Sequence, residues 1–119
     1  SNITPDRLRF DFPYPQKLTE EQIKKVENLV NEKIKENLPV SFRQVSFEEA
    51  KKMGALAFFE EKYNKEAVKV YTIGKEQDFF SREVCGGPHV KRTGVLGEFK
   101  IIKEESVGAG KRRIYGVLE

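Results

Sequence analysis

The sequence predicts an α+β fold, a two-layer sandwich in which a mostly antiparallel sheet is covered by helices. Two observations lead to this prediction. Segments with the two-residue alternation of half-buried strands occur at both ends of the chain, and segments with helical periodicity lie between them. The strands and helices also follow no regular β-α-β order, which argues against a parallel sheet. Because 119 residues suffice for one hydrophobic core, we expect a single domain, residues 1–119.

The first predicted elements are a strand and a long helix. Residues 7–12, RLRFDF, alternate charged and apolar side chains, and the PYP that follows ends the strand because proline has no N–H to donate. Thr19 and Gln22 then have the spacing of a capping box. Apolar residues recur every three or four positions as far as Ile34, which predicts an amphipathic helix that ends before Pro39.

The remaining elements are mostly strands. Residues 40–45 form the next predicted strand, and Ser46 begins a short helix that stops at Gly54. Residues 54–63 suit a buried helix or a turn equally well. Four further strands are predicted, the last two joined by a glycine-containing hairpin turn: residues 67–74, 79–84, 98–106 and 111–118.

Composition narrows the class of protein. A charged share of 34% and a hydrophobic share of 38% are typical of a well-solvated globular protein. No apolar run reaches membrane-spanning length and the chain begins with no signal-peptide pattern, so we expect no membrane contact and a cytoplasmic location. The single cysteine, Cys85, excludes an internal disulfide. The net charge is +3, with basic clusters at residues 91–92 and 111–113, which are more often solvated surface than phosphate contacts.

The turn CGGPH contains the only cysteine and the only histidine, Cys85 and His89. Such a turn can bring a thiolate and an imidazole to one metal ion, and both groups are zinc ligands. The pair is half of a metal site, a cysteine–histidine nucleophile pair, or a structural cysteine beside a turn histidine, which is the commonest case for an isolated pair. Asp78 or Glu83 would complete a metal shell, but neither has a spacing that singles it out.

Several motifs together resemble a known family. The segments DRLRFDF, GALAFFEEKY, VKVYTIG, FSREVCGGPHVKRTGVLGEFKI and KEESVGAGKRRI are similar, in order and spacing, to the editing domain of alanyl-tRNA synthetases, also called the second additional domain. Free-standing alanyl-tRNA editing proteins share this domain, and threonyl-tRNA synthetases carry a relative. The resemblance extends over about residues 6–114. It implies an aminoacyl-tRNA deacylase that removes serine or glycine from mischarged tRNA(Ala) as a second sieve.

The resemblance also implies a zinc site. In the family, a His-x-x-x-His pair binds zinc together with the cysteine and histidine of the turn, here Cys85 and His89, and water is the nucleophile. The family's His-x-x-x-His pair precedes the DRLRFDF strand and has no counterpart here, because His89 is the only histidine. We therefore expect a domain without its N-terminal His-x-x-x-His segment, either a fragment of a synthetase polypeptide or a homologue without the full zinc shell. Such a chain alone would be a weak or inactive deacylase.

Two functions other than editing stay open at this point. One is a non-catalytic module that binds the tRNA acceptor end, and the other is a scaffold that contributes two ligands to a site completed by another chain. Deacylation of serine-charged tRNA(Ala) would exclude the first, whereas salt-sensitive tRNA binding without deacylation would support it.

Matching positions imply further substrate or tRNA contacts. Pro88 stands where alanyl enzymes typically have threonine and threonyl enzymes have proline, so the specificity between the two stays open. Thr93 and Gly94 are expected to start a helix or tight turn whose N–H groups bind a phosphate or carboxylate, or simply cap the turn. Of Arg112 and Arg113, one is expected to face the site. The expected substrate- or tRNA-binding residues are Gly86, Gly87, Pro88, Lys91, Arg92, Thr93, Gly94, Arg112 and Arg113.

Overall fold

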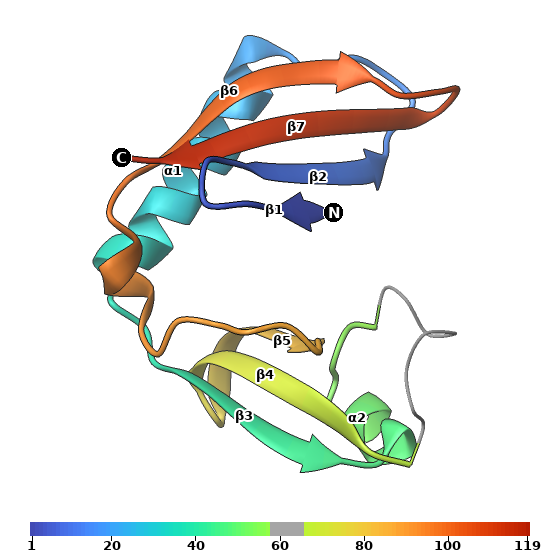
Figure 1. Ribbon diagram of the computed structural model, residues 1–119, viewed down its shortest axis with the longest axis vertical. Helices are drawn as coiled ribbons and strands as arrows, with labels where there is room; N and C mark the ends of the chain where they lie inside the picture. Colours follow the sequence, from blue (N-terminus) through green and yellow to red (C-terminus); the bar gives the residue numbers. More distant parts are fainter. Residues whose placement is uncertain (58–65) are drawn as a thin grey trace. The chain divides into compact units, whose positions relative to one another are not determined.

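The computed structural model describes residues 1–57 and 66–119 (Figure 1). The chain divides into two compact units, unit 1 with residues 1–36 and 96–119, and unit 2 with residues 37–95. In the described ranges, no helix is long and apolar enough to cross a membrane. Of the ambiguous segment 54–63, residues 58–63 lie outside the described residues. Its described part includes Leu56, which forms an isolated parallel bridge with Glu83 of the neighbouring strand.

The α+β class agrees with the structure, but the predicted two-layer sandwich is wrong. The strands form two separate antiparallel sheets, one with the order β1-β2-β7-β6 and one with the order β3-β4-β5. Of the described helices, one packs against the first sheet and a different one packs against the second sheet. The helices therefore do not cover a single sheet together. Alternation along a strand predicts which side chains face a core, but it does not determine which strand lies next to it. The sequence pattern therefore could not divide the strands between two sheets.

Unit 1 is the four-stranded sheet with one long helix (Figure 1). The predicted hairpin of its last two strands is confirmed. The two-residue strand at the start of the chain was not predicted, because it is too short to show alternation. Its elements are β1 (Asn2–Ile3), β2 (Leu8–Pro13), α1 (Glu20–Lys35), β6 (Phe99–Ser106) and β7 (Lys111–Leu118).

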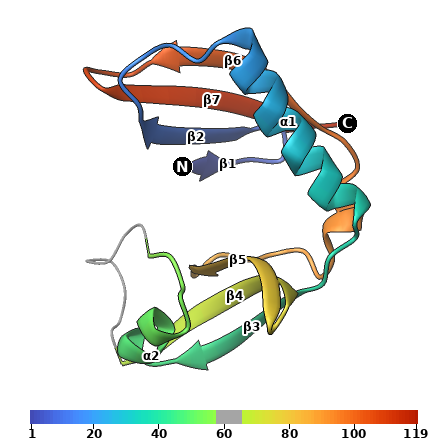
Figure 2. The ribbon, with the colours of Figure 1, turned by 180° about the vertical axis from the view of Figure 1, so that it is seen from behind.

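Helix α1 packs against the edge strand β6 (Figure 2). The predicted capping box is present, with Thr19 Oγ1 accepting from the Gln22 N–H at 3.1 Å. Asn31 exchanges two hydrogen bonds with the backbone of Phe99, at 2.8 and 2.7 Å. Two residues after Phe99, the Ile101 N–H donates to the Glu27 carboxylate of the helix at 2.9 Å. These bonds satisfy backbone groups on the side of β6 that has no neighbouring strand, so α1 protects this edge of the sheet.

Phe99 makes a close contact with Gly116 in unit 1. The Phe99 side chain is 6% exposed and lies directly over Gly116 in the neighbouring strand β7. A Cβ at position 116 would overlap the ring atoms of Phe99. Glycine at position 116 therefore leaves the room that the Phe99 ring occupies.

A buried ion pair connects the two strands of the hairpin. The Arg112 guanidinium donates to both carboxylate oxygens of Glu104, at 2.6 and 2.7 Å. The Leu18 N–H, just before α1, donates to the same carboxylate at 3.2 Å. The Glu104 side chain is only 3% exposed. The hydrogen bonds from Arg112, more than any other contact, lower the pKa of Glu104 below its ordinary value.

The stability of the folded chain should fall as the solution is acidified. A carboxyl whose pKa is lowered by folding stabilises the folded state above its unfolded pKa, here 4.5, and this stabilisation is lost as the pH falls through the folded value. Urea unfolding from about pH 6 to about pH 3 should show this decline. The decline should be smaller in Glu104→Gln, which cannot titrate at this position. The same pH dependence in both proteins would contradict the assignment to Glu104.

Unit 2 is the three-stranded sheet with one short helix (Figure 1). The predicted strands and the helix that begins after Ser46 are all confirmed. Its elements are β3 (Val40–Val45), α2 (Phe47–Lys52), β4 (Val68–Lys75), β5 (Asp78–Val84) and the start of the 3-10 helix η2 (Thr93–Leu96).

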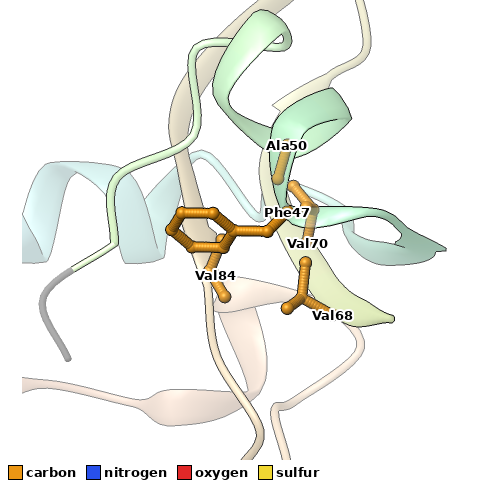
Figure 3. Close-up of a cluster of buried hydrophobic side chains, with 5 residues drawn as sticks. All are labelled: Phe47, Ala50, Val68, Val70 and Val84. Carbon is orange, nitrogen blue, oxygen red and sulfur yellow. The ribbon is translucent and has the colours of Figure 1, made fainter. Parts of the chain in front are cut away.

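One face of this sheet packs against α2. Phe47 and Ala50 of the helix meet valines of β4 and β5, as Figure 3 shows. Val70 is 1% exposed and Phe47 is 3% exposed. The cluster is the hydrophobic core of unit 2, and it consists of Phe47, Ala50, Val68, Val70 and Val84.

The opposite face of the same sheet carries aromatic and polar side chains. Phe42 pairs with Tyr71, and Tyr71 pairs with Glu83, so these three residues lie side by side on one face. Lys69 lies two residues before Tyr71 and therefore shares this face, as does Cys85 two residues after Glu83. We call this surface the aromatic face.

Candidate functional site

The segment that follows β5 carries both predicted metal ligands onto the aromatic face. The Cys85 N–H donates to the Lys69 carbonyl oxygen at 3.1 Å, which holds Cys85 beside β4. Four residues later, the His89 ring stacks on Tyr71, with ring centroids 3.8 Å apart and an interplanar angle of 24°. Tyr71 is the aromatic residue that β4 presents on this face, two residues after Lys69. Strand β4 therefore contacts both residues, through the backbone at Cys85 and through the Tyr71 ring at His89.

The segment then continues to the start of β3. The Val40 N–H donates to the Lys91 carbonyl oxygen at 2.9 Å, and Pro39 forms an isolated bridge with Arg92. Residues 85–92 thus cross the sheet from the end of β5 to the edge strand β3. Lys91 and Arg92 both have exposed side chains, and the Arg92 guanidinium donates to the Asn37 carbonyl oxygen at 2.7 Å.

The donor atoms of the pair fit a zinc ion. His89 Nδ1 lies 3.1 Å from the Gly87 carbonyl oxygen, so a proton on Nδ1 would leave Nε2 free to bind a metal. Cys85 is a free, half-buried thiol. A Cβ at Gly86 would meet nothing within 4 Å, and one at Gly87 would only touch the Cys85 sulfur at 3.8 Å. Neither glycine is therefore needed to avoid a backbone clash, and a thiolate and an imidazole are two ligand types that zinc accepts.

A third metal ligand is not found among residues 1–57 and 66–119. No group of three or more histidine, cysteine, aspartate or glutamate side chains is arranged to hold a metal ion there. Asp78 pairs with Lys75 at the far end of β5 from Cys85. Glu83 lies on the aromatic face, where burial raises the pKa of its carboxyl and the nearby His89 opposes that rise. Of the two acidic residues considered from the sequence, Glu83 is the one near the pair.

Thr93 and Gly94 use their N–H groups within the chain. The Thr93 N–H donates to the Leu38 carbonyl oxygen at 2.9 Å, and its side-chain oxygen accepts from the Leu38 N–H at 2.8 Å. The Gly94 N–H donates to Asn37 Oδ1 at 3.1 Å. Because these donors are already occupied, the geometry favours the capping interpretation over an anion site.

Arg112 and Arg113 lie in unit 1, whereas Cys85 and His89 lie in unit 2. Arg112 binds Glu104, and Arg113 donates to both carboxylate oxygens of Asp11 at 2.7 and 2.9 Å. Both arginines therefore hold β7 to a neighbouring strand.

Sequence reasoning missed the aromatic partners of this site. Phe42 lies 5.3 Å from Tyr71 between ring centroids, at an angle of 37°. Alternation predicts the face on which Phe42 lies. Nothing in the sequence indicates that a histidine from a distant turn stacks on Tyr71 next to it.

Comparison with known proteins identifies the family. Residues 68–115 match the family described as the threonyl and alanyl tRNA synthetase second additional domain. Over all 119 residues, the chain is 59% identical to an alanine–tRNA ligase of Treponema denticola and 55% identical to one of Treponema pallidum. The chain belongs to the second additional domain family. The resemblance seen in its motifs is thereby confirmed.

This second additional domain covers only part of its relatives. It spans 19% of the length of each of the two Treponema ligases. An alanine–tRNA ligase of Petrotoga mobilis is 49% identical over 117 residues, which are 13% of its length. The range matched by the family includes β4, β5 and the whole turn with Cys85 and His89.

Proposed function

We propose that this second additional domain takes part in editing, the hydrolysis of serine or glycine from mischarged tRNA(Ala), as part of a longer alanine–tRNA ligase. The observation that carries this proposal is that the backbone of Cys85 is held beside Lys69 and the His89 ring stacks on Tyr71, so both residues lie over the aromatic face, with the Glu83 carboxyl near His89. The names of the most similar relatives support tRNA(Ala) as the partner. A separate hydrolytic site serves accuracy because a binding pocket distinguishes poorly between amino acids that differ by one small group.

Cys85 and His89 would hold zinc through the thiolate and Nε2. When bound, zinc supplies Lewis acidity toward an ester carbonyl and helps to orient the aminoacyl group. The residues around the pair prepare it for this role. The Gly87 carbonyl and the Tyr71 ring orient the imidazole, and the backbone bond to Lys69 holds the cysteine in place. With only one histidine in the sequence, we expect weak deacylase activity from this chain alone.

A non-catalytic module that binds the tRNA acceptor end is the second candidate. Two observations favour it: the exposed basic residues Lys91 and Arg92 beside the pair, and the lack of a third metal-binding side chain in the described part of the chain. Contacts of such residues with phosphates would make binding sensitive to salt. Either function belongs in the cytoplasm, where the free thiol of Cys85 stays reduced.

Zinc content and hydrolysis of serine-charged tRNA(Ala) separate the two candidates. Editing predicts about one zinc per chain and release of serine faster than in buffer, with alanine-charged tRNA(Ala) as the control that stays intact. Salt-sensitive tRNA binding without zinc and without serine release would establish the binding module instead. Zinc-loaded protein that hydrolyses both charged tRNAs equally would contradict a role in editing.

A further inference from the structure

A second recognition feature lies on the aromatic face, in a strand remote in sequence from Cys85 and His89. Phe42 is in the middle of β3 and is 54% exposed, whereas its neighbour Tyr71 is 9% exposed. A single exposed apolar side chain is ordinary on a protein surface. Phe42 differs because its ring contacts Tyr71 in a tilted arrangement, and Tyr71 in turn stacks with His89.

Phe42, Tyr71 and His89 form a continuous aromatic ladder across the sheet. The centroids of the first two rings are 5.3 Å apart, and those of the last two are 3.8 Å apart. Tyr71, which contacts both other rings, is buried, so the exposed members of the ladder are Phe42 and His89. The exposed Phe42 ring is held in place by its contact with Tyr71. Such a ring is well suited to stack with an unpaired nucleobase, because its side chain loses little conformational entropy when the base binds.

Positive charge lies next to this ladder. Lys69 Nζ lies over the Phe42 ring in a cation–π contact, 5.1 Å from the ring centroid, so a base that stacks on this ring would take over the contact and leave the ammonium group to a phosphate. Lys91 is exposed, and its carbonyl oxygen binds the N–H of Val40, two residues before Phe42 in the same strand. A stacking ring beside ammonium groups is the combination with which proteins bind single-stranded nucleic acid, since the base and the phosphate are bound together.

We propose that Phe42 is the platform on which an unpaired base of the tRNA 3′ end stacks, with Lys69 and Lys91 contacting its phosphates. The proposal rests on the proposed function and adds to it a residue that decides where the RNA lies. Phe42 is outside the motifs that carry the family resemblance and outside the matched range of residues 68–115. Its ring partners Tyr71 and His89 lie inside that range.

Binding of two labelled RNA probes tests the platform. The first probe is the single-stranded trinucleotide CCA, and the second has the same backbone with an abasic 3′ residue. Fluorescence anisotropy at one fixed low salt concentration should show tighter binding of CCA to the wild-type chain. Phe42→Leu should weaken CCA binding about tenfold and leave the abasic probe nearly unaffected, whereas Phe42→Tyr should keep most of the affinity. Phe80→Leu, at a phenylalanine of β5 that is 49% exposed, is the matched control and should bind like the wild type.

Several results would overturn the platform. Unchanged CCA affinity in a folded Phe42→Leu protein would do so, and so would an equal loss for both probes, since the ring would then not contact the base. Self-association that Phe42→Leu abolishes without any effect on RNA would identify a protein contact instead. Serine release measured on the same proteins separates this proposal from the proposed function. Wild-type hydrolysis with unchanged CCA affinity in the variant refutes only the platform, and a wild type that neither binds CCA nor releases serine refutes both.

Discussion

Replacing Cys85 by serine should lower the zinc affinity of the chain by more than about 100-fold. Loss of a residue that only supports a metal ligand lowers affinity by up to about 100-fold, and loss of a ligand itself should cost more. The thiolate is the stronger ligand of the proposed pair, and a serine hydroxyl does not ionise at neutral pH. Cobalt in place of zinc makes the change visible, because a thiolate–cobalt bond has its own absorption band. Cys85→Ser should lose this band. His89→Ala should keep the band while binding cobalt more weakly.

Ser81→Ala is the matched control for this experiment. Ser81 lies on β5 two residues before Glu83, on the same face of the sheet as Cys85. It offers no metal ligand of comparable strength, so its replacement should leave zinc and cobalt binding unchanged. Equal zinc binding by Cys85→Ser and the wild type would show that the metal is held elsewhere, and a wild type that binds no zinc would contradict the metal site altogether.

Replacing Phe47 by alanine should lower the free energy of unfolding by about 3–5 kcal/mol. The ring is 3% exposed and fills the space between α2 and the valines of β4 and β5. Since whole domains are stable by only about 5–15 kcal/mol, this loss is a large fraction of the total stability. Urea unfolding followed by circular dichroism measures the change.

The exposed Phe42 provides the comparison within the same sheet. Phe42→Ala removes the same side chain from a surface position and should cost less than about 1 kcal/mol. Equal losses in the two variants would contradict the assignment of the core to the α2 side of the sheet. The core residues Val70 and Val84 directly precede Tyr71 and Cys85 in sequence. We therefore expect Phe47→Ala to weaken zinc binding as well, since the strands that position the site would loosen.

The sequence by itself determined the local elements of this domain and its family. The alternation in residues 7–12 and the capping box at Thr19 predicted β2 and the start of α1, because both signals depend on residues a few positions apart. The five motifs identified the second additional domain for the same reason, since each is a short continuous segment. Cys85 and His89 stood out as the only residues of their types. Their role as zinc ligands stays a prediction.

Only the tertiary structure decided which elements and side chains meet. It divided the strands between two sheets, and it placed Asn31 of α1 on the free edge of β6. It also buried Arg82, whose guanidinium donates to Thr72 and to the carbonyl oxygens of Met53 and Glu76. Contacts of this kind join residues up to 102 positions apart, as between Arg113 and Asp11, and local patterns do not record them. A periodic pattern records which side of an element is apolar, but it does not record the partner on that side.

The aromatic face shows the same division most clearly. Alternation predicts that Phe42 and Tyr71 each point to one side of a strand, but their pairing is a matter of register between two strands about thirty residues apart in the sequence. The stacking of His89 on Tyr71 requires in addition that an irregular turn fold back over the sheet. Neither event leaves a local signal, because the free energy that drives it comes from contacts made only once the three-stranded sheet and the turn have formed.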